Sequence, residues 1–498
     1  MKNKLTIFII LAILISALAF GGCSSRKDGY FGGIDNSLFN QNKGDEYLDI
    51  DENPVILTSA QATSNFSMYY NTAAYANIRR YINNNIALNK NMVNIENMVN
   101  YFKYSYQPPT NNEILALNGS IYPCPWNDDA YLLTLGLKAQ EIEMSGKKNN
   151  LVFLLDVSGS MDSPNKMGLM QSAFSMIVQN LTENDTVSIV TYAGQDSVIL
   201  EGANGTEQKR ILNKIEDLSA GGSTAGARGI ETAYEIAKRY FIDGQDANNR
   251  IILATDGDFN VGISSTNQLA EFIKQKAEQD NIYLTLLGFG YGNLKANIME
   301  TIAKNGNGSY HYIDTLTEAR KVLIEEMGGT LVTVAKDVKA QVEFNPKYVY
   351  SYRLLGYENY LLTNDQWEDN KTDAGEIGSG HTVTAVYEIV LQDPDNDIQS
   401  TMDNNYLSLT IKYKDSNDIS QADLKMYMDA SDKILLPNED EDFIASIVEA
   451  ALIMRDSQYK GTADINRVIN RLQFLACTKS DEYKAEFLDL MKKYKEQL

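Results

Sequence analysis

The sequence is poor in the residues that form cysteine- and histidine-based sites. It has 3 cysteines and 2 histidines among 498 residues. Cys124 and Cys477 lie far apart in the chain, without a CxxC spacing or a neighbouring histidine, which excludes a zinc site of the usual pattern. We expect both thiols to be free, although the sequence alone leaves open a disulfide in an oxidising compartment. His311 and His381 fall in different predicted segments, and we expect them to be structural rather than catalytic.

The chain is also short of basic residues. Its 44 lysines and arginines face 66 aspartates and glutamates, so the formal net charge is −22. Nucleic-acid binding needs a basic surface, so this balance excludes it and suits an acidic surface that keeps a secreted protein soluble. The hydrophobic fraction of 44% and the charged fraction of 22% are typical of globular proteins. A chain of this length predicts two or three domains, and no internal repeat is evident.

The first residues have the pattern of a bacterial lipoprotein signal peptide. Lys2 and Lys4 form a positive n-region, Leu5–Phe20 forms an apolar h-region, and Gly21-Gly22-Cys23-Ser24-Ser25 follows. Small residues before a cysteine at this place resemble a lipobox, in which the cysteine is lipidated and becomes the mature N-terminus. The alternative is an uncleaved membrane anchor. Both predict an extracytoplasmic protein, and the first predicts a lipid anchor at Cys23 in the cell membrane or the outer membrane.

Composition and periodicity divide the chain into six segments. In chain order they are a signal peptide (1–23), a flexible tether (24–54), an N-terminal flanking region (55–148), an α/β domain (149–330), a β-rich, sandwich-like domain (331–435) and a C-terminal helical region (436–498). In the flanking region, apolar residues recur at helical spacing between about Ser64 and Tyr106, whereas Tyr131–Leu137 alternates like a strand. We expect Tyr131–Leu137 to pair with the later strands, because an isolated strand needs partners.

The segment 149–330 alternates between strands and helices. Leu151–Asp156 and Arg250–Thr255 are apolar runs of the kind expected for parallel strands buried on both faces. Thr186–Tyr192 and Val198–Leu200 are expected to form a hairpin at the sheet edge. The alternation predicts an α/β fold with a doubly wound, mainly parallel sheet, helices on both faces and a ligand site outside the carboxyl ends of the strands.

Three loops of this segment carry side chains suited to a hard cation. Asp156-Val-Ser158-Gly-Ser160 follows the first buried strand, Gly221-Gly222-Ser223-Thr224 precedes a helix, and Asp256 follows a second buried strand. A carboxylate and two hydroxyls at i, i+2 and i+4 can point at one centre, and such oxygen ligands suit Mg²⁺ that keeps part of its water shell. Each pattern alone also fits a capping Asp or Ser. All three, each at a strand-to-loop junction, predict a metal site.

These residues resemble the metal-ion-dependent adhesion site (MIDAS) of von Willebrand factor type A (VWA) domains. The resemblance implies that Ser158 and Ser160 ligate the cation directly, and that Thr224 does so directly or through water. It implies that Asp156 and Asp256 hold coordinated waters or bind directly. The cation is expected to be Mg²⁺, with Mn²⁺ or Ca²⁺ as alternatives.

The resemblance extends to both flanks, over nearly all of the mature chain. Tyr75–Tyr81, Glu96–Phe102, Pro125-Trp126, Gly356–Asn359 and Asp373–Ala385 are similar to segments of the YfbK-like bacterial lipoproteins, in which a VWA domain lies between an N-terminal region and a C-terminal domain of unknown function. One departure is Ser67-Met-Tyr-Tyr-Asn71, where the family has an Asp-rich stretch.

The predicted function is metal-dependent binding rather than catalysis. A cation held by few negative ligands keeps an open position, which an Asp or Glu carboxylate of a partner protein can fill. Hydrolysis would need a base or nucleophile beside the metal, and none is evident, so we expect the protein not to be an enzyme. The alternatives are an envelope assembly or accessory factor with a mainly structural metal, and a metal-dependent hydrolase.

Three further patterns lie outside the metal motif itself. Gly288-Phe-Gly290-Tyr-Gly292 lacks the spacing of a nucleotide loop and predicts a glycine turn. Asp162 and Asp258 flank the metal loops as outer ligands or as an acidic rim. The acidic run Asn438–Asp442 is expected to supply favourable charge to a helix N-terminus rather than to bind calcium.

Overall fold

The computed structural model describes residues 45–498, with gaps at 46, 112, 143–146, 194–195, 223–225, 245–246, 258–265, 292–293, 307, 327–328, 330–331, 394–401, 403 and 418. The predicted signal peptide with Cys23, most of the tether, Thr224 and Asp258 lie outside the described residues. Within the described ranges, no helix has the length and apolar character needed to span a membrane.

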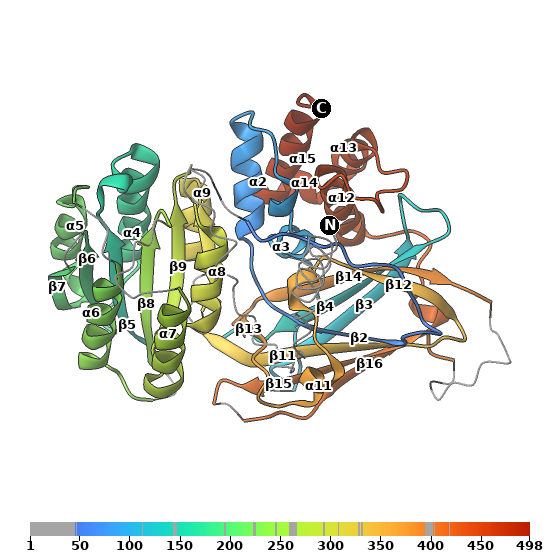
Figure 1. The fold of residues 1–498 in the computed structure, drawn as a ribbon, viewed down its shortest axis with the longest axis horizontal. Coiled ribbons are helices and arrows are strands. Elements are labelled where there is room, and N and C mark those ends of the chain that lie inside the picture. Colours follow the sequence, from blue (N-terminus) through green and yellow to red (C-terminus); the bar gives the residue numbers. More distant parts are fainter. Residues whose placement is uncertain are drawn as a thin grey trace, which may run out of the picture. The chain divides into compact units, whose positions relative to one another are not determined.

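The central segment forms a six-stranded sheet (Figure 1). Its strands are β5 (Lys148–Asp156), β6 (Asp185–Tyr192), β7 (Asp196–Asn204), β8 (Ala247–Thr255), β9 (Tyr283–Phe289) and β10 (Tyr310–Ile313). The spatial order is β10-β9-β8-β5-β6-β7, and every neighbouring pair is parallel except the antiparallel edge pair β6–β7. The predicted edge hairpin is therefore present. The strand order reverses at β5, so the switch point lies between β5 and β8, where open α/β sheets bind ligands.

Helices cover both faces of this sheet because β5 is apolar on both sides. Leu151, Phe153 and Leu155 pack in one core cluster, whereas Val152 and Leu154 pack in another. The first cluster includes residues of α4 (Leu169–Gln179), α5 (Gln208–Glu216) and α9 (Leu316–Arg320), and the second includes residues of α6 (Gly226–Arg239), α7 (Thr266–Asp280) and α8 (Ala296–Asn305). The predicted doubly wound α/β fold is confirmed.

Two further sheets are built jointly from the flanks of the central segment. One has the order β1-β12-β14-β4-β3, with bounds Ile56–Leu57, Val349–Leu355, Thr382–Leu391, Tyr131–Ala139 and Leu115–Pro123. The other has the order β13-β11-β15-β16, with bounds Gly375–Gly378, Thr333–Phe344, Leu407–Asp415 and Leu424–Met428, and β2 (Thr63–Ser67) also pairs with β11. Apolar residues of both sheets share one core cluster, as in a sandwich.

The expected pairing of Tyr131–Leu137 with later strands is present. β4 runs antiparallel to β14, with Leu137 opposite Val383 and Leu133 opposite Tyr387. The predicted segments 55–148 and 331–435 thus contribute strands to the same sheets, with the α/β domain inserted between them in sequence.

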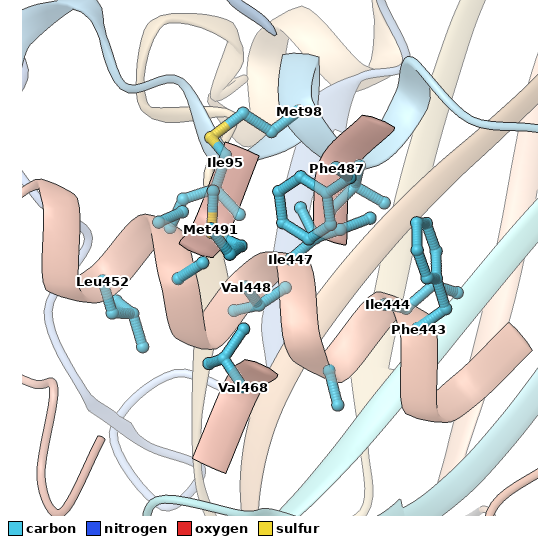
Figure 2. Close-up of a cluster of buried hydrophobic side chains, with 14 of the residues drawn as sticks. Ile95, Met98, Phe443, Ile444, Ile447, Val448, Leu452, Val468, Phe487 and Met491 are labelled. Carbon is cyan, nitrogen blue, oxygen red and sulfur yellow. The ribbon is translucent and has the colours of Figure 1, made fainter. Parts of the chain in front are cut away.

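Helices from both ends of the chain share a core over the first of these sheets. They are α2 (Ala73–Asn83), α3 (Ile95–Asn100), α12 (Glu439–Met454), α13 (Ile465–Phe474), α14 (Cys477–Ser480) and α15 (Glu482–Lys495). Figure 2 shows Ile95 and Met98 of α3 beside Ile447 and Val448 of α12. All four side chains are buried. Short helical turns complete the fold: η2 (Lys90–Met92), η3 (Gly159–Met161), η4 (Pro164–Gly168), η5 (Gly205–Glu207), η6 (Lys321–Glu325), η7 (Glu358–Tyr360), α11 (Asn364–Glu368) and η8 (Ala430–Asp432).

Of three local predictions, the fold confirms two and shows one to be wrong at its start. The helical spacing expected from about Ser64 is wrong at its start, because Thr63–Ser67 is strand β2 and α2 begins at Ala73. The acidic run does begin a helix: the Asn438 side chain accepts hydrogen bonds from the N–H groups of Asp440 and Glu441, which caps α12. Cys124 and Cys477 are both free thiols, as predicted.

Candidate metal centre

The Asp156-Val-Ser158-Gly-Ser160 motif forms a tight turn at the carboxyl end of β5. Oδ1 of Asp156 accepts a hydrogen bond from the N–H of Ser158 at 2.9 Å, which closes the turn. The hydroxyls of Ser158 and Ser160 lie 3.0 Å apart. Asp156 and Ser158 are buried and Ser160 is half-buried, so the motif opens to solvent on the Ser160 side. The two hydroxyl oxygens therefore lie close enough to share one ligand.

Asp256 reaches the same sheet edge from the neighbouring strand. β8 runs parallel to β5 with Ala254 beside Leu155, so Thr255 and Asp256 follow at the level of Asp156. The Thr255 hydroxyl donates a hydrogen bond to Oδ2 of Asp156 at 2.9 Å. The structure thus brings the first and third predicted loops together at the switch point of the sheet.

Backbone hydrogen bonds hold the start of the second loop against the motif. The N–H of Gly221 donates to the carbonyl of Val157 at 2.8 Å, and the N–H of Gly159 donates to the carbonyl of Gly222 at 3.2 Å. Thr224, the predicted ligand of this loop, lies outside the described residues. These contacts place Gly221 and Gly222 against the motif, and Gly222 lies two residues before Thr224 in the chain.

Asp156 lies in an environment that disfavours a lone negative charge. Burial raises its pKa, hydrogen bonds from Ser158 and Thr255 oppose that rise, and the nearby Asp256 adds to it. The hydroxyl of Tyr192 also lies 3.2 Å from Oδ2 of Asp156. A cation placed between the two aspartates would relieve this electrostatic cost.

Lys166 already supplies one positive charge at the site. It belongs to η4, and its ammonium Nζ lies 2.9 Å from Oδ2 of Asp256 and 3.0 Å from the main-chain oxygen of Ser160. The side chain of Lys166 is 11% exposed and that of Asp256 is fully buried. Lys166 therefore bridges the first and third of the predicted loops.

Sequence reasoning assigned no role to Tyr192, Thr255 or Lys166. Tyr192 is the last residue of β6 and pairs with Asp156 in the parallel register, so the rule that ligand sites lie at the carboxyl ends of strands would have found it. Thr255 directly precedes Asp256. No sequence pattern pointed to a role for Lys166 at the site, because a lysine at the start of an amphipathic segment is ordinarily exposed to solvent.

The donor set fits a hard divalent cation. Two carboxylates and two hydroxyls provide oxygen ligands only, which Mg²⁺ prefers and which softer metals do not. Among the described residues, no group of three or more His, Cys, Asp and Glu side chains is placed to hold a metal ion. A cation here would therefore depend on the serine hydroxyls, as in the predicted site.

The two histidines contact neighbouring side chains. His311 hydrogen bonds to Ser309 at 2.9 Å, and the ring of His381 stacks on Tyr70 at a centroid distance of 4.1 Å. His311 is buried, whereas His381 is half-buried with both of its ring nitrogens shielded from solvent. Burial lowers the pKa of His311 to about 3 and that of His381 to about 4. Asp162 is exposed beside the motif.

A doubly wound sheet with this motif at its switch point defines a VWA domain. The family model described as "von Willebrand factor type A domain" matches residues 151–258, and one described as "von Willebrand factor" matches residues 41–134. A third, "Uncharacterized protein YfbK, C-terminal", matches residues 329–497. The chain is 35% identical over 467 residues to "Uncharacterized protein YfbK" of Escherichia coli K12, covering 89% of this chain and 80% of that protein. The chain belongs to the YfbK-like family of VWA proteins.

Other proteins are similar to the chain at lower sequence identity. Inter-alpha-trypsin inhibitor heavy chain H3 of Mus musculus is 25% identical over 266 residues, which are 49% of this chain and 29% of that protein. A solved VWA structure from Catenulispora acidiphila aligns with a TM-score of 0.43 and 19% identity over 78% of this chain and 91% of that chain. The ArnB paralog VWA2 of Sulfolobus acidocaldarius aligns with a TM-score of 0.35 and 16% identity, over 77% of this chain and 97% of that chain. Proteins with a VWA domain generally act in protein–protein interaction or adhesion.

Proposed function

We propose that this protein is a lipid-anchored extracytoplasmic adhesion or interaction protein whose VWA domain binds a partner through a divalent cation. The residues that would hold the cation, Mg²⁺ first, are Asp156, Ser158, Ser160, Thr224 and Asp256. One observation carries the proposal: two loops distant in sequence place Asp156, Ser158, Ser160 and Asp256 at one switch point of the sheet, tied by the Thr255–Asp156 hydrogen bond.

The chemistry of this donor set favours binding over catalysis. A divalent cation bound there would act as a Lewis acid that attracts an Asp or Glu carboxylate of the partner. Ser158, Tyr192, Thr255 and Lys166 each donate a hydrogen bond to one of the two aspartates. A general base would have to accept a proton instead. The protein is accordingly proposed to be a binding protein and not an enzyme.

Metal binding is tested first by calorimetric titration of the purified full chain with Mg²⁺. Wild type is expected to bind one cation, and Ser158→Ala is expected to abolish measurable binding. Ser172→Ala is the matched control, because Ser172 is an exposed residue of α4 whose hydroxyl donates a hydrogen bond to the carbonyl of Gly168. Equal binding by wild type and Ser158→Ala would refute the site.

Partner binding is tested by a pull-down from cell-envelope extract with wild type, Ser158→Ala and Ser172→Ala, each with Mg²⁺ and with EDTA. The proposal expects a partner retained by wild type and Ser172→Ala in Mg²⁺ and lost in EDTA and with Ser158→Ala. Binding that survives both EDTA and Asp156→Ala would instead support the accessory-factor alternative, in which the metal is mainly structural.

The lipid anchor is tested separately, by metabolic labelling with a clickable fatty acid in a bacterial host. Wild type is expected to incorporate the label, whereas Cys23→Ala should not. Labelling that persists in Cys23→Ala would refute lipidation at this residue. Loss of the signal peptide from wild type, measured by intact mass, distinguishes the lipoprotein from the uncleaved anchor.

A further inference from the structure

The side chain of Lys166 is held in a defined position beside the proposed metal site. Its ammonium Nζ contacts Oδ2 of Asp256 at 2.9 Å and the main-chain oxygen of Ser160 at 3.0 Å. One contact is with a proposed metal ligand, and the other is with the backbone of a second ligand residue. A single positive charge therefore already bridges the two loops that a divalent cation would bridge.

A glycine turn makes room for the lysine side chain. Gly290 has a positive φ of +75°, and a Cβ at this position would lie 2.3 Å from Cε and 2.4 Å from Cγ of Lys166. The hydroxyl of Tyr312 donates a hydrogen bond to the carbonyl of Gly290 at 2.5 Å, which holds the turn in place. The absence of a side chain at Gly290 thus leaves the space in which the Lys166 side chain lies. The lysine is positioned by the fold and does not simply extend from the surface.

We propose that Lys166 is an internal counter-ion that competes with the divalent cation for Asp256. The inference rests on the proposed metal site. In the geometry of this structure, the ammonium neutralises Asp256 and links it to the Ser158–Ser160 turn. A divalent cation that engages Asp256 has to displace the ammonium, so Lys166 sets the cation concentration above which the site becomes competent to bind a partner.

The charges of the site explain why such a competitor is effective. Asp256 is fully buried, and a buried carboxylate without a neighbouring cation is costly. A lysine ammonium is a compact charge on a flexible stem, so it can leave the carboxylate by rotation of its own side chain without movement of the backbone. A divalent ion carries twice the charge of the ammonium, so at high concentration it displaces the ammonium from Asp256.

The first test measures Mg²⁺ affinity by calorimetry for wild type, Lys166→Met and Lys238→Met. Methionine keeps most of the length of the side chain and removes the charge. Lys166→Met is expected to bind Mg²⁺ about 10-fold or more tightly than wild type, since the lost charged hydrogen bond no longer opposes binding. Lys238→Met is the matched control, because Lys238 lies in the same domain, is 63% exposed and pairs with Asp280.

The second test uses the wild-type protein and does not depend on the folding of a variant. Acetylation of lysine amines by a water-soluble acetylating reagent is followed by mass spectrometry in EDTA and in saturating Mg²⁺. Lys166 is expected to react slowly in EDTA, because its side chain is 11% exposed, and several-fold faster in Mg²⁺. Lys238 should react equally in both conditions.

The outcomes separate this inference from the proposed function. Mg²⁺ binding by wild type that Lys166→Met leaves unchanged or weakens, or acetylation of Lys166 that Mg²⁺ does not increase, would overturn the competition and leave the metal site standing. Absence of Mg²⁺ binding in both wild type and Lys166→Met would overturn the metal site and this inference together. Binding that is measurable only in Lys166→Met would support both.

Discussion

The guanidinium of Arg79 in α2 pairs with the carboxylate of Asp314, the residue that follows the last strand of the VWA domain. Nε of Arg79 lies 2.9 Å from Oδ2 of Asp314, and Nη2 hydrogen bonds to the other carboxylate oxygen. Arg79 also donates to Glu318 at 2.8 Å and to Glu486 of α15 at 2.9 Å. Its side chain is fully buried, and those of Asp314 and Glu318 nearly so. One arginine therefore ties the VWA domain to both flanks of the chain.

Arg79→Met is expected to lower the free energy of unfolding by about 3–5 kcal/mol, because it leaves two buried carboxylates without their cation. Urea unfolding followed by circular dichroism measures this. Arg239→Met is the matched control, since Arg239 and its partner Glu201 are 57% and 34% exposed. Such a surface pair contributes about 0–1 kcal/mol. Similar losses of unfolding free energy in the two variants would show that the buried Arg79 pairs contribute no more stability than an exposed pair.

His381 predicts an acid-sensitive fold. Burial lowers its pKa to about 4, whereas an unfolded histidine titrates near 6.5. The unfolded chain therefore binds more protons between these pH values, so the stability due to His381 is complete above pH 6.5 and is lost as the pH falls toward 4. In His381→Phe, which keeps a ring against Tyr70, the fall in unfolding free energy between pH 7 and pH 4.5 should be smaller by on the order of 2 kcal/mol. Coincident pH profiles of the two proteins would contradict this prediction.

Gly290→Ala should destabilise the protein by about 1–3 kcal/mol, because a side chain at a positive φ is strained and its Cβ would meet Lys166. Gly168→Ala supplies the contrast. Gly168 has a φ of −64° and no atom within 4 Å of an added Cβ, so the same substitution should be neutral or stabilising by up to about 1 kcal/mol. Thermal unfolding of the two variants in EDTA measures the difference, and equal melting temperatures would count against the strained turn.

Tyr192→Phe is expected to weaken Mg²⁺ binding by about 10-fold without unfolding the domain, since it removes a hydrogen bond that orients the carboxylate of Asp156. Calorimetric titration measures the affinity. Tyr234→Phe is the matched control, because the buried Tyr234 hydroxyl in α6 forms no hydrogen bond within the described part of the chain. An unchanged affinity in Tyr192→Phe would mean that Asp156 is oriented by Ser158 and Thr255 alone.

The central fold could be predicted because its signals are local. A parallel strand buried on both faces appears in the sequence as a continuous apolar run, and Leu151–Asp156 and Arg250–Thr255 show this pattern. Strands of the flanking sheets were harder to predict. β3 (Leu115–Pro123) carries Asn-Gly-Ser at its centre, and β2 (Thr63–Ser67) is mostly polar. Each is held in its sheet by a partner from elsewhere in the chain, and pairing of that kind leaves little mark on local composition.

The sequence by itself predicted the chemistry of the candidate site: which oxygen donors are present, and that Asp156 and Asp256 lie at the carboxyl ends of buried strands. It also determined the family, through motifs spread over nearly the whole mature chain. Only the tertiary structure decided which strands pair across the inserted VWA domain, that Arg79 joins the domain to its flanks and that Lys166 contacts Asp256. The reason is physical. Periodicity and capping act over a few residues, whereas the partner of a buried charge or a strand edge is chosen by packing between segments that are remote in sequence.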